Sequence, residues 1–312
     1  MLDIVGKRYW FFLISALVII PGLIAMMVSM ARFGTPLRLS IDFTGGALME
    51  LQFQQPVAPG DVRAVFVAHD YSDTMVQTTV DQRTVLVRSK PLDSATKVLI
   101  QDELREKFGP LTELRYEFVG PTVGREVTRS AALAVLAAAG AIIMYLIFAF
   151  RSVPNAIRYG ICAVAAMIHD ILVAVGVFSI LGLALGWEVD ALFLTAILTV
   201  IGFSVQDTIV VFDRIRENIP KCRGEPFELV VNRSLLETLH RSLATQLNAI
   251  FVLIAIFFFG GATMKQFVTV LIVGLLSGTY SSICNAVPLL VVWEKNEIGQ
   301  FFARLRGRPA QA

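Results

Sequence analysis

Six long apolar runs dominate the pattern of hydrophobic and polar positions along the chain. They cover residues 9–30, 130–150, 159–185, 191–212, 241–259 and 267–293. Each can cross a hydrocarbon layer of about 30 Å as a helix, which takes about 20 residues. The first run exceeds the roughly 7–15 apolar residues of a cleaved signal peptide, so we interpret it as a retained span. The pattern predicts an α-helical polytopic membrane protein with six transmembrane helices.

Between residues 31 and 128 the apolar positions alternate with polar ones instead of forming long runs. Alternation at 47–53, 74–80, 84–88 and 114–119 predicts half-buried strands. Residues 59–69 and 93–108 are predicted as helices, with Asp93 or Ser94 as the cap of the second and Gly109-Pro110 as its end. The order β-α-β-β-α-β predicts an inserted ferredoxin-like α+β domain.

Composition agrees with a membrane protein, because 55% of the 312 residues are hydrophobic and the mean hydropathy is +0.68. A net charge of +2 is too small to indicate nucleic-acid binding. We divide the chain into a cytoplasmic N-terminus with the first span (1–30), the inserted domain (31–128), a five-helix bundle (129–293) and a cytoplasmic tail (294–312).

Lysine and arginine are distributed unequally between the two sides of the predicted membrane domain. One side's short segments carry Lys7, Arg8, Arg151, Arg158, Arg214, Arg216, Lys221, Arg223, Arg233, Lys295, Arg304, Arg306 and Arg308, whereas the other side's short loops carry Lys265. Because basic loops resist translocation, we expect both termini in the cytoplasm and the inserted domain outside it.

Two glycine-containing motifs flank the inserted domain. The first is Asp42-Phe43-Thr44-Gly45-Gly46, in which paired glycines permit a tight turn; we interpret it mainly as a structural turn. The second, residues 119–124, contains Gly120, Pro121 and Gly124 and joins the domain to the second span. This segment is either a linker or a hinge.

Asp207 lies within the fourth apolar run, where an ionisable group is costly. Ser204 and Thr208 share its side of the predicted helix. A neighbouring stripe consists of Thr195, Thr199, Gly202 and Gln206. This helix is therefore predicted to pack against protein or water over adjoining faces.

Arg241 heads a polar stripe at the start of the fifth run, where Thr238, Arg241, Thr245 and Asn248 follow a three-four-three spacing. An interfacial arginine that extends to the headgroups is one explanation. However, residues 249–259 alone are too few to span the bilayer, so we expect Arg241 to enter it. Asp207 and Arg241 are then expected to meet, either as a functional pair or as a static salt bridge.

Other polar groups near the membrane have structural explanations. His169-Asp170 in the third run is a further candidate, although hydrogen-bonded polar pairs in bundles are as often structural. Asp213, Arg214 and Arg216 form a boundary motif typical of a solvated helix end. Gly274 and Gly278 make a small-xxx-small pair for helix packing. We find no Walker loop, metal cluster or nucleophile-histidine arrangement, so neither an enzyme nor a cofactor is expected.

Five segments of the chain closely resemble the SecD/SecF family of bacterial protein-export membrane proteins, and within it the SecF branch. They are residues 42–46, 119–121, 201–218, 232–234 and 238–242. The resemblance covers nearly the whole chain. It implies membership of the resistance-nodulation-division superfamily and assigns the functional intramembrane pair to Asp207 and Arg241. Gln206 departs from the asparagine expected there; the carboxylate of Asp207 is kept, but the family's detailed hydrogen bonding is not carried over to this position.

The same resemblance implies a subunit of the Sec translocase in the cytoplasmic membrane. It would act with SecD and the SecYEG translocon on a translocating preprotein, use the proton motive force, and contact lipid but not nucleic acid. One six-helix half is present, so a SecD chain would have to complete a conduction path. The alternatives are a half-size efflux-type transporter subunit and a structural stabiliser of SecD or the translocon.

The charge asymmetry gives a direct test of topology at Gln82, in the inserted domain. A Gln82→Cys variant should react with a membrane-impermeant thiol reagent added outside intact spheroplasts. Labelling only from the cytoplasmic side would overturn the predicted orientation.

Overall fold

The computed structural model describes residues 3–295 except 73, 79–81, 152–155 and 261. The chain divides into two compact units, which are described separately. One contains Met1–Arg38 and Val135–Ala312, and the other contains Leu39–Ala134. Most of the predicted tail, including Arg304, Arg306 and Arg308, lies outside the described residues. Residues 152–155, in the loop after the second span, also lie outside them.

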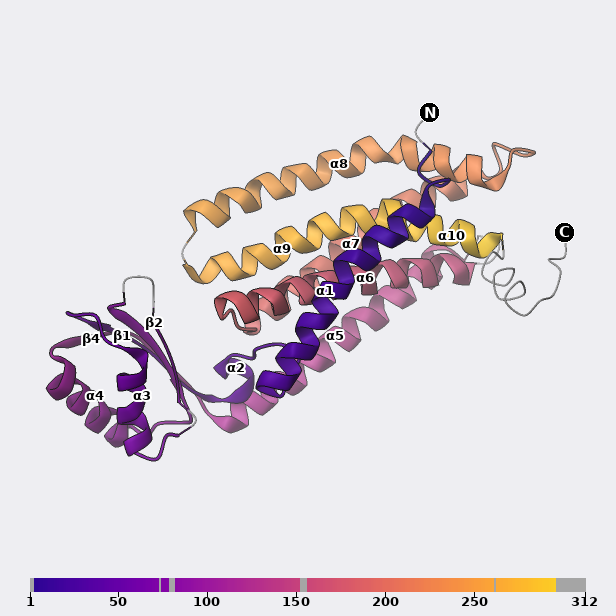
Figure 1. The fold of residues 1–312 in the computed structure, drawn as a ribbon. Coiled ribbons are helices and arrows are strands. Elements are labelled where there is room, and N and C mark those ends of the chain that lie inside the picture. Colours follow the sequence, from indigo (N-terminus) through magenta and orange to yellow (C-terminus); the bar gives the residue numbers. More distant parts are fainter. Residues whose placement is uncertain (1–2, 73, 79–81, 152–155, 261, 296–312) are drawn as a thin grey trace, which may run out of the picture. The chain divides into compact units, whose positions relative to one another are not determined.

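Long helices form the first unit, as Figure 1 shows. They are α1 (Arg8–Phe33), the later part of α5 (Pro121–Ala149), α6 (Ala156–Leu185), α7 (Ala191–Asn218), α8 (Phe227–Phe259), α9 (Ala262–Ser281), a π-helical turn η1 (Ser282–Ala286) and α10 (Val287–Glu294). In the described residues, six helical segments are long and apolar enough to cross a membrane. The predicted number of spans is confirmed.

Two of these helices begin well before the apolar runs that predicted them. α5 starts at Pro121 instead of residue 130, and α8 starts at Phe227 instead of residue 241. The reason is that apolar composition marks the part of a helix suited to hydrocarbon, whereas hydrogen bonding continues the helix through polar turns outside it. The apolar pattern therefore located the spans but not the helix ends.

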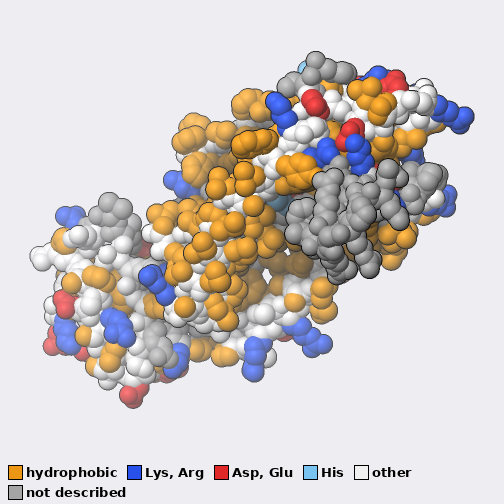
Figure 2. All heavy atoms as spheres, turned by 45° about the vertical axis from the view of Figure 1, so that its right-hand side comes forward, with side chains coloured by type: hydrophobic (Ala, Val, Ile, Leu, Met, Phe, Trp, Pro, Cys, Tyr) orange, Lys and Arg blue, Asp and Glu red, His pale blue; other side chains and the backbone are white. Residues whose placement is uncertain are grey.

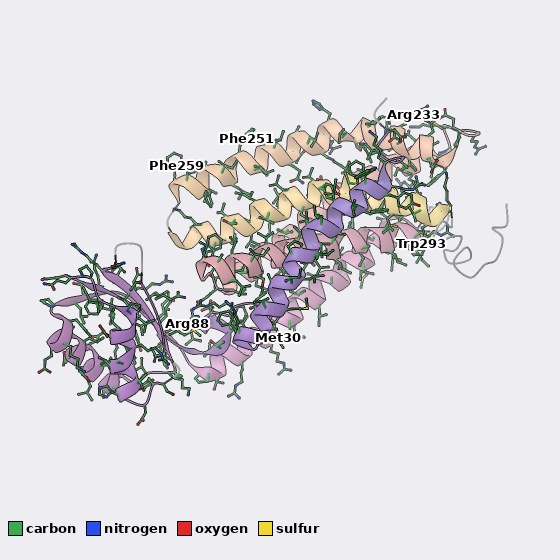
Figure 3. The ribbon with its side chains drawn as sticks, in the orientation of Figure 1. Met30, Arg88, Arg233, Phe251, Phe259 and Trp293 are labelled. Carbon is green, nitrogen blue, oxygen red and sulfur yellow. The ribbon has the colours of Figure 1, made fainter. Side chains whose placement is uncertain are left out.

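The six spans are buried to different extents. In α6, α7 and the α9–α10 segment, half or more of the residues in the apolar 18-residue stretch are buried. In α1, α5 and α8, at most 17% of the corresponding residues are buried. On α8, Phe251 and Phe259 are 66% and 92% exposed and project from the helix in Figure 3. Hydrophobic side chains also cover much of the face of these helices seen in Figure 2. This surface suits lipid or another membrane protein.

Glycines allow the closest helix contacts. A Cβ on Gly22 of α1 would lie 2.7 Å from the Cα of Gly176 of α6, and one on Gly176 would lie 2.9 Å from the Cα of Gly22. On α9, a Cβ on Gly278 would lie 3.4 Å from the Cα of Ser204 of α7, and one on Gly274 would clash with Val200. Small residues thus bring the backbones of α1 and α6, and of α7 and α9, together.

Charged side chains join several helices at one end of the bundle. Glu228, near the start of α8, pairs with Arg8 at the start of α1 (3.3 Å) and with Lys295 just after α10 (2.6 Å). Arg158 near the start of α6 pairs with Glu294. Figure 1 shows the start of α1, the turn between α7 and α8, and the end of α10 at this end. Basic residues that were assigned to one side of the membrane therefore lie together.

The second unit contains a four-stranded antiparallel sheet with strand order β2-β3-β1-β4. Its strands are β1 (Gly46–Phe53), β2 (Met75–Thr78), β3 (Thr84–Ser89) and β4 (Leu111–Val119), and its helices are α2 (Ile41–Thr44), α3 (Pro59–Ala68), α4 (Ser94–Phe108) and the start of α5. The predicted order β-α-β-β-α-β is confirmed, while the name ferredoxin-like stays a prediction.

Alternation produces the core of this unit. Ala47, Met49, Leu51 and Phe53 of β1 point to one side and are at most 2% exposed, where they pack with Phe66 of α3 and Leu104 of α4. Asp93 caps α4 by accepting a hydrogen bond from the Thr96 amide at 3.4 Å, and Gly109 ends it with φ at 86°. The predicted cap and stop are both confirmed.

The Gly22–Gly176 contact gives a test of packing. Gly176→Ala should destabilise the bundle by about 1–3 kcal/mol, because the added methyl group meets backbone atoms that cannot rotate away. Gly160→Ala on the same helix is the matched control, since its Cβ meets nothing within 4 Å and alanine favours the helix. A melting temperature in detergent that is equal for the two variants would contradict this packing.

Candidate functional site

α7 places Asp207 inside the bundle. The helix begins with Asp190 as its cap, whose Oδ1 accepts a hydrogen bond from the Phe193 amide at 2.8 Å. Buried side chains recur every three or four residues along α7, and Asp207 lies among them at 6% exposure. Ser204 and Thr208 are buried on the same side. This face of α7 packs against protein, as the sequence predicted.

Gln246 of α8 is the side chain that meets Asp207. Its Nε2 donates a hydrogen bond to Asp207 Oδ2 at 2.7 Å. Within the described part of the chain, the buried Oε1 of Gln246 has no hydrogen-bond partner. A neutral amide can donate to a carboxylate or to a carboxylic acid, so this contact is compatible with both protonation states of Asp207.

Arg241 does not meet Asp207 in this structure. It precedes Gln246 by five residues, which at 3.6 residues per turn places it about 140° away around the axis of α8. Its side chain is exposed, and among the described residues no ion pair with Arg241 is found. The expected contact between Asp207 and Arg241 is therefore not formed within the single chain.

The stripe that was predicted around Arg241 faces mostly outward. Thr238 is buried, but Arg241, Thr245 and Asn248 are exposed. The inward side of α8 instead carries buried side chains at a spacing of four, namely Thr238, Ser242, Gln246 and Ile250. Periodicity grouped the polar residues correctly, but it did not determine which group faces α7.

Asp170 of α6 forms a second buried polar centre and is 0% exposed. Its Oδ2 accepts hydrogen bonds from Ser204 Oγ of α7 and Ser281 Oγ of α9, each at 2.6 Å. Its Oδ1 accepts one from Ser277 Oγ of α9 at 2.6 Å. The Nδ1 atom of His169 lies 3.0 Å from Oδ1. The carboxyl group thus joins three helices, and its hydroxyl partners replace water.

A separate side of α7 is polar but exposed. Gly202 and Gln206 are exposed, and Thr195 and Thr199 continue the same stripe. Gly202 and Gln206 line an open cavity of about 310 Å³ together with Ile142 and Tyr145 of α5. A polar helix face at membrane depth requires protein or water against it.

The boundary motif fastens the end of α7 to α8. Arg214 pairs with Glu217 (2.8 Å) and with Glu237 of α8 (2.5 Å). Arg216 pairs with Asp213 at 2.7 Å. These side chains are between a third and a half exposed, so they form a solvated, ion-paired helix end, and each pair contributes little by itself.

The Asp42–Gly46 motif forms a tight turn before β1. Asp42 and Phe43 lie in the single-turn helix α2, which Ser40 caps through a hydrogen bond from the Asp42 amide at 3.2 Å. Gly45 and Gly46 follow with φ at 71° and 133°. A Cβ on Gly46 would lie 2.6 Å from the carbonyl oxygen of Ser89. Glycine is therefore required at both positions by conformation and by space.

The proposed hinge packs against this turn. Gly120 is the single residue between β4 and α5, and Pro121 begins α5. A Cβ on Gly124 would lie 2.8 Å from the Gly45 nitrogen, and one on Gly45 would lie 2.9 Å from the Pro121 Cα. The segment is thus a short junction held by backbone contacts, which the spacing of its glycines alone did not indicate.

Three residues of the two buried polar centres were not predicted from the sequence. Ser277 and Ser281 recur four apart on α9, beside Gly274 and Gly278, and this spacing was a usable signal. Gln246 gave a weaker signal, because it lies beside the Arg241 stripe. Among the described residues, no group of three or more His, Cys, Asp or Glu side chains has a metal-binding arrangement.

The six spans, the inserted α/β unit and the buried carboxyl groups define a multi-pass α-helical membrane protein with a polar bundle interior. Residues 99–296 match the family described as protein export membrane protein SecD/SecF, C-terminal. Residues 33–57 match the SecD/SecF GG motif, which includes the Gly45-Gly46 turn. The chain belongs to the SecD/SecF family of protein export membrane proteins.

Relatives named protein translocase subunit SecF match the chain from end to end. One from Anaerolinea thermophila is 50% identical over 315 aligned positions and covers 100% of both chains. One from Thermobaculum terrenum is 48% identical and covers 97% of this chain and 98% of its own.

Solved structures of SecDF share the fold. The crystal structure from Thermus thermophilus matches with a TM-score of 0.79 at 30% identity and covers 94% of this chain. A SecDF structure in a super-membrane-facing form gives a TM-score of 0.65 at 29% identity. This chain spans 39% and 40% of those longer chains, respectively.

The contact between α7 and α8 can be tested by cross-linking. In a Cys222→Ser background, the pair Asp207→Cys with Gln246→Cys should be joined efficiently by a short bifunctional thiol reagent. The pair Asp207→Cys with Arg241→Cys should be joined far less, because residue 241 faces away. The measurement is the mobility shift after cleavage of the α7–α8 loop. Preferential cross-linking through position 241 would contradict the observed orientation of α8.

Proposed function

We propose that the chain is the SecF-type subunit of a bacterial Sec translocase. In this proposal it acts with SecD in the cytoplasmic membrane, has both termini in the cytoplasm, and uses the proton motive force to promote late translocation and release of preproteins. It needs no cofactor, does not bind nucleic acid, and contacts lipid, the SecYEG translocon and the emerging preprotein.

The observation that carries the proposal is the burial of Asp207 in a membrane span of a protein-export family member. Asp207 is 6% exposed, and its carboxyl group accepts a hydrogen bond from the neutral side chain of Gln246 at 2.7 Å. A buried ionisable group at membrane depth is costly, and such groups commonly mark ion or proton pathways. Asp207 is therefore the proposed proton carrier.

A partner is supported by two polar stripes that the single chain leaves exposed. One contains Gly202 and Gln206 on α7, and the other contains Arg241, Thr245 and Asn248 on α8. Neither stripe suits hydrocarbon, where each unpaired polar group costs free energy. A SecD half that covers both stripes would remove this cost, and in the proposed cycle a rotation of α8 within the complex brings Arg241 toward Asp207.

Arg241 would then influence the protonation of Asp207. Removal of water favours the neutral form of a carboxyl group, whereas a nearby guanidinium favours the charged form. In the proposed cycle, Asp207 releases its proton when Arg241 approaches and takes one up when Arg241 withdraws. Gln246 can hold the carboxyl group in either state. Proton flow is thereby coupled to the packing of α7, α8 and the partner.

Movement would reach the inserted domain through the junction at Gly120. Pro121 and Gly124 start α5, which continues into the bundle, and both contact the turn of Gly45. A rotation of α5 would therefore act on β4 and on this turn directly. We assign to the inserted domain, which we regard as ferredoxin-like, the task of holding and releasing a preprotein on the outer side.

A purely structural role as a stabiliser of SecD or the translocon is the main alternative. It treats Asp207 and Arg241 as packing elements whose charge does not change. A half-size efflux subunit is disfavoured, because the relatives that match this chain over its full length are named as translocase subunits. Gradient dependence separates the structural role from the proposed one.

The proposal predicts that Asp207→Asn abolishes gradient-stimulated translocation while expression and SecD binding persist. The amide has nearly the same shape and can still bond to Gln246, but it cannot carry a proton. Arg241→Met should have the same effect. The measurement is preprotein translocation into vesicles that contain SecD and this chain, with and without an imposed gradient.

Thr245→Val is the matched control for the exposed stripe, because its hydroxyl group bonds to the Arg241 carbonyl oxygen of its own helix at 2.9 Å. It should retain at least half of the gradient response. Normal stimulation in a well-expressed Asp207→Asn protein would refute the assignment of Asp207 as proton carrier.

A further inference from the structure

The polar centre around Asp170 contains more hydrogen-bonding groups than helix packing requires. Three serine hydroxyl groups from α7 and α9 donate to it at 2.6 Å. Gly278 of α9 borders this centre, where a Cβ would lie 3.7 Å from Asp170 Oδ2 and 3.4 Å from the Ser204 Cα, both ordinary van der Waals distances. Such an arrangement solvates a carboxylate in place of water, as a site for a charged group must.

His169 connects this centre to a cavity. Its Nδ1 lies 3.0 Å from Asp170 Oδ1, whereas its Nε2 is buried and has no hydrogen-bond partner in the described part of the chain. The ring lines a mainly apolar cavity of about 250 Å³ between α1, α6 and α9, whose other polar residues are Ser15, Ser277 and Tyr280. A buried polar atom without a partner calls for an explanation such as a water or a transferred proton.

The local backbone is also unusual. Immediately after Ser281, α9 passes into the π-helical turn η1 (Ser282–Ala286). Within it, Asn285 Oδ1 accepts a hydrogen bond from Ser15 Oγ at 3.0 Å. π-Turns inside long helices occur frequently at functional sites. Ser15 of α1, which lines the cavity, is thereby hydrogen-bonded to this turn.

We propose that His169 and Asp170 form a second proton-binding site, which is loaded from the cavity between α1, α6 and α9 and controls the contact of α7 with α9. This inference rests on the proposed function and extends it to a residue pair outside the Asp207 and Arg241 region.

The proton transfer can be written with all protons accounted for. A hydronium ion in the cavity gives a proton to His169 Nε2 and becomes water. The imidazolium then releases its Nδ1 proton to Asp170 Oδ1, which leaves a neutral histidine and a neutral carboxylic acid. Loss of the Nε2 proton to the cavity, with return of the Asp170 proton to Nδ1, resets the site.

Protonation changes the contacts between helices because hydrogen bonds to a carboxylate are charge-assisted and stronger than hydrogen bonds to a neutral carboxylic acid. The acid proton on Oδ1 donates to His169 Nδ1, so Ser204, Ser277 and Ser281 continue to donate to Asp170, but their hydrogen bonds weaken. Ser204 lies one helical turn before Asp207 on α7, so a rearrangement there reaches the proposed proton carrier. The two carboxyl groups are thereby linked through a single helix.

Few other ionisable groups occur on the helices packed around the pair. α7 supplies Asp207, and α9 with η1 supplies Tyr280 and Cys284, while the charged residues within 213–217 of α7 and Lys265 of α9 lie toward the helix ends. Between residues 10 and 31, α1 contains no ionisable side chain. Tyr280 is engaged by its hydrogen bond to the Phe11 carbonyl oxygen at 2.6 Å. A change in protonation in this region is therefore assigned to His169 and Asp170.

Infrared difference spectroscopy on the complex with SecD in lipid tests the site without using translocation. In an Asp207→Asn background, acidification should produce the C=O stretching band of a protonated carboxyl group, at the position typical of an apolar environment. That band should be lost in the further variant Asp170→Asn, and His169→Gln should shift the pH at which it appears. Absence of the band, or its persistence in Asp170→Asn, would overturn the site.

A second measurement separates the site from a structural role. Ser281→Ala and His169→Gln in the otherwise unaltered complex should lower gradient-stimulated translocation at least fivefold per assembled complex. Ser282→Ala is the matched control, because this adjacent buried hydroxyl group bonds to the Thr279 carbonyl oxygen of its own helix at 3.1 Å, and it should retain the response.

Unchanged stimulation in His169→Gln, with Asp207 still required, would refute this inference alone. Loss of gradient dependence in the unaltered complex would refute the proposed function instead, while the carboxyl band still decides the site.

Discussion

The cost of leaving polar groups unsatisfied in a hydrocarbon environment determines most of this structure. Asp170 is buried among serine hydroxyl groups and a histidine, which satisfy its carboxyl group. Asp207 is buried where it accepts a hydrogen bond from Gln246. Arg241 and Gln206 remain exposed in the single chain. The same constraint therefore explains which polar groups the chain satisfies internally and which polar groups require a partner.

Close helix packing makes this internal solution possible. Gly274 of α9 packs closely against Val200 of α7, and three serines of these two helices reach one carboxyl group. The contact of Gly22 with Gly176 joins α1 to α6 in a similar way. α6, α7 and α9 thus form a well-packed interior, whereas α5 and α8 remain largely exposed. A bundle of this kind combines a fixed centre with helices whose surroundings depend on a second chain.

The sequence predicted the spans, the order of strands and helices, and the burial of Asp207, because each follows from periodicity within one segment. It did not predict that Gln246, rather than Arg241, faces Asp207. Both residues lie on one helix, and the direction in which that helix turns depends on its neighbours. Ser277 and Ser281 were missed for a related reason, since their partner Asp170 lies on another helix. Likewise, the contact of Gly124 with Gly45 joins segments far apart in the chain.

In the mechanism that we propose, a path for protons exists only when this chain and SecD assemble, and it passes through Asp207. The most direct test is proton flux into liposomes that carry the purified complex under an imposed pH gradient, recorded with an internal pH-sensitive dye. We expect proton flux for the complex, none for either subunit alone, and none for an intact complex with Asp207→Asn. Flux through this chain alone, or undiminished flux in the Asp207→Asn complex, would contradict it.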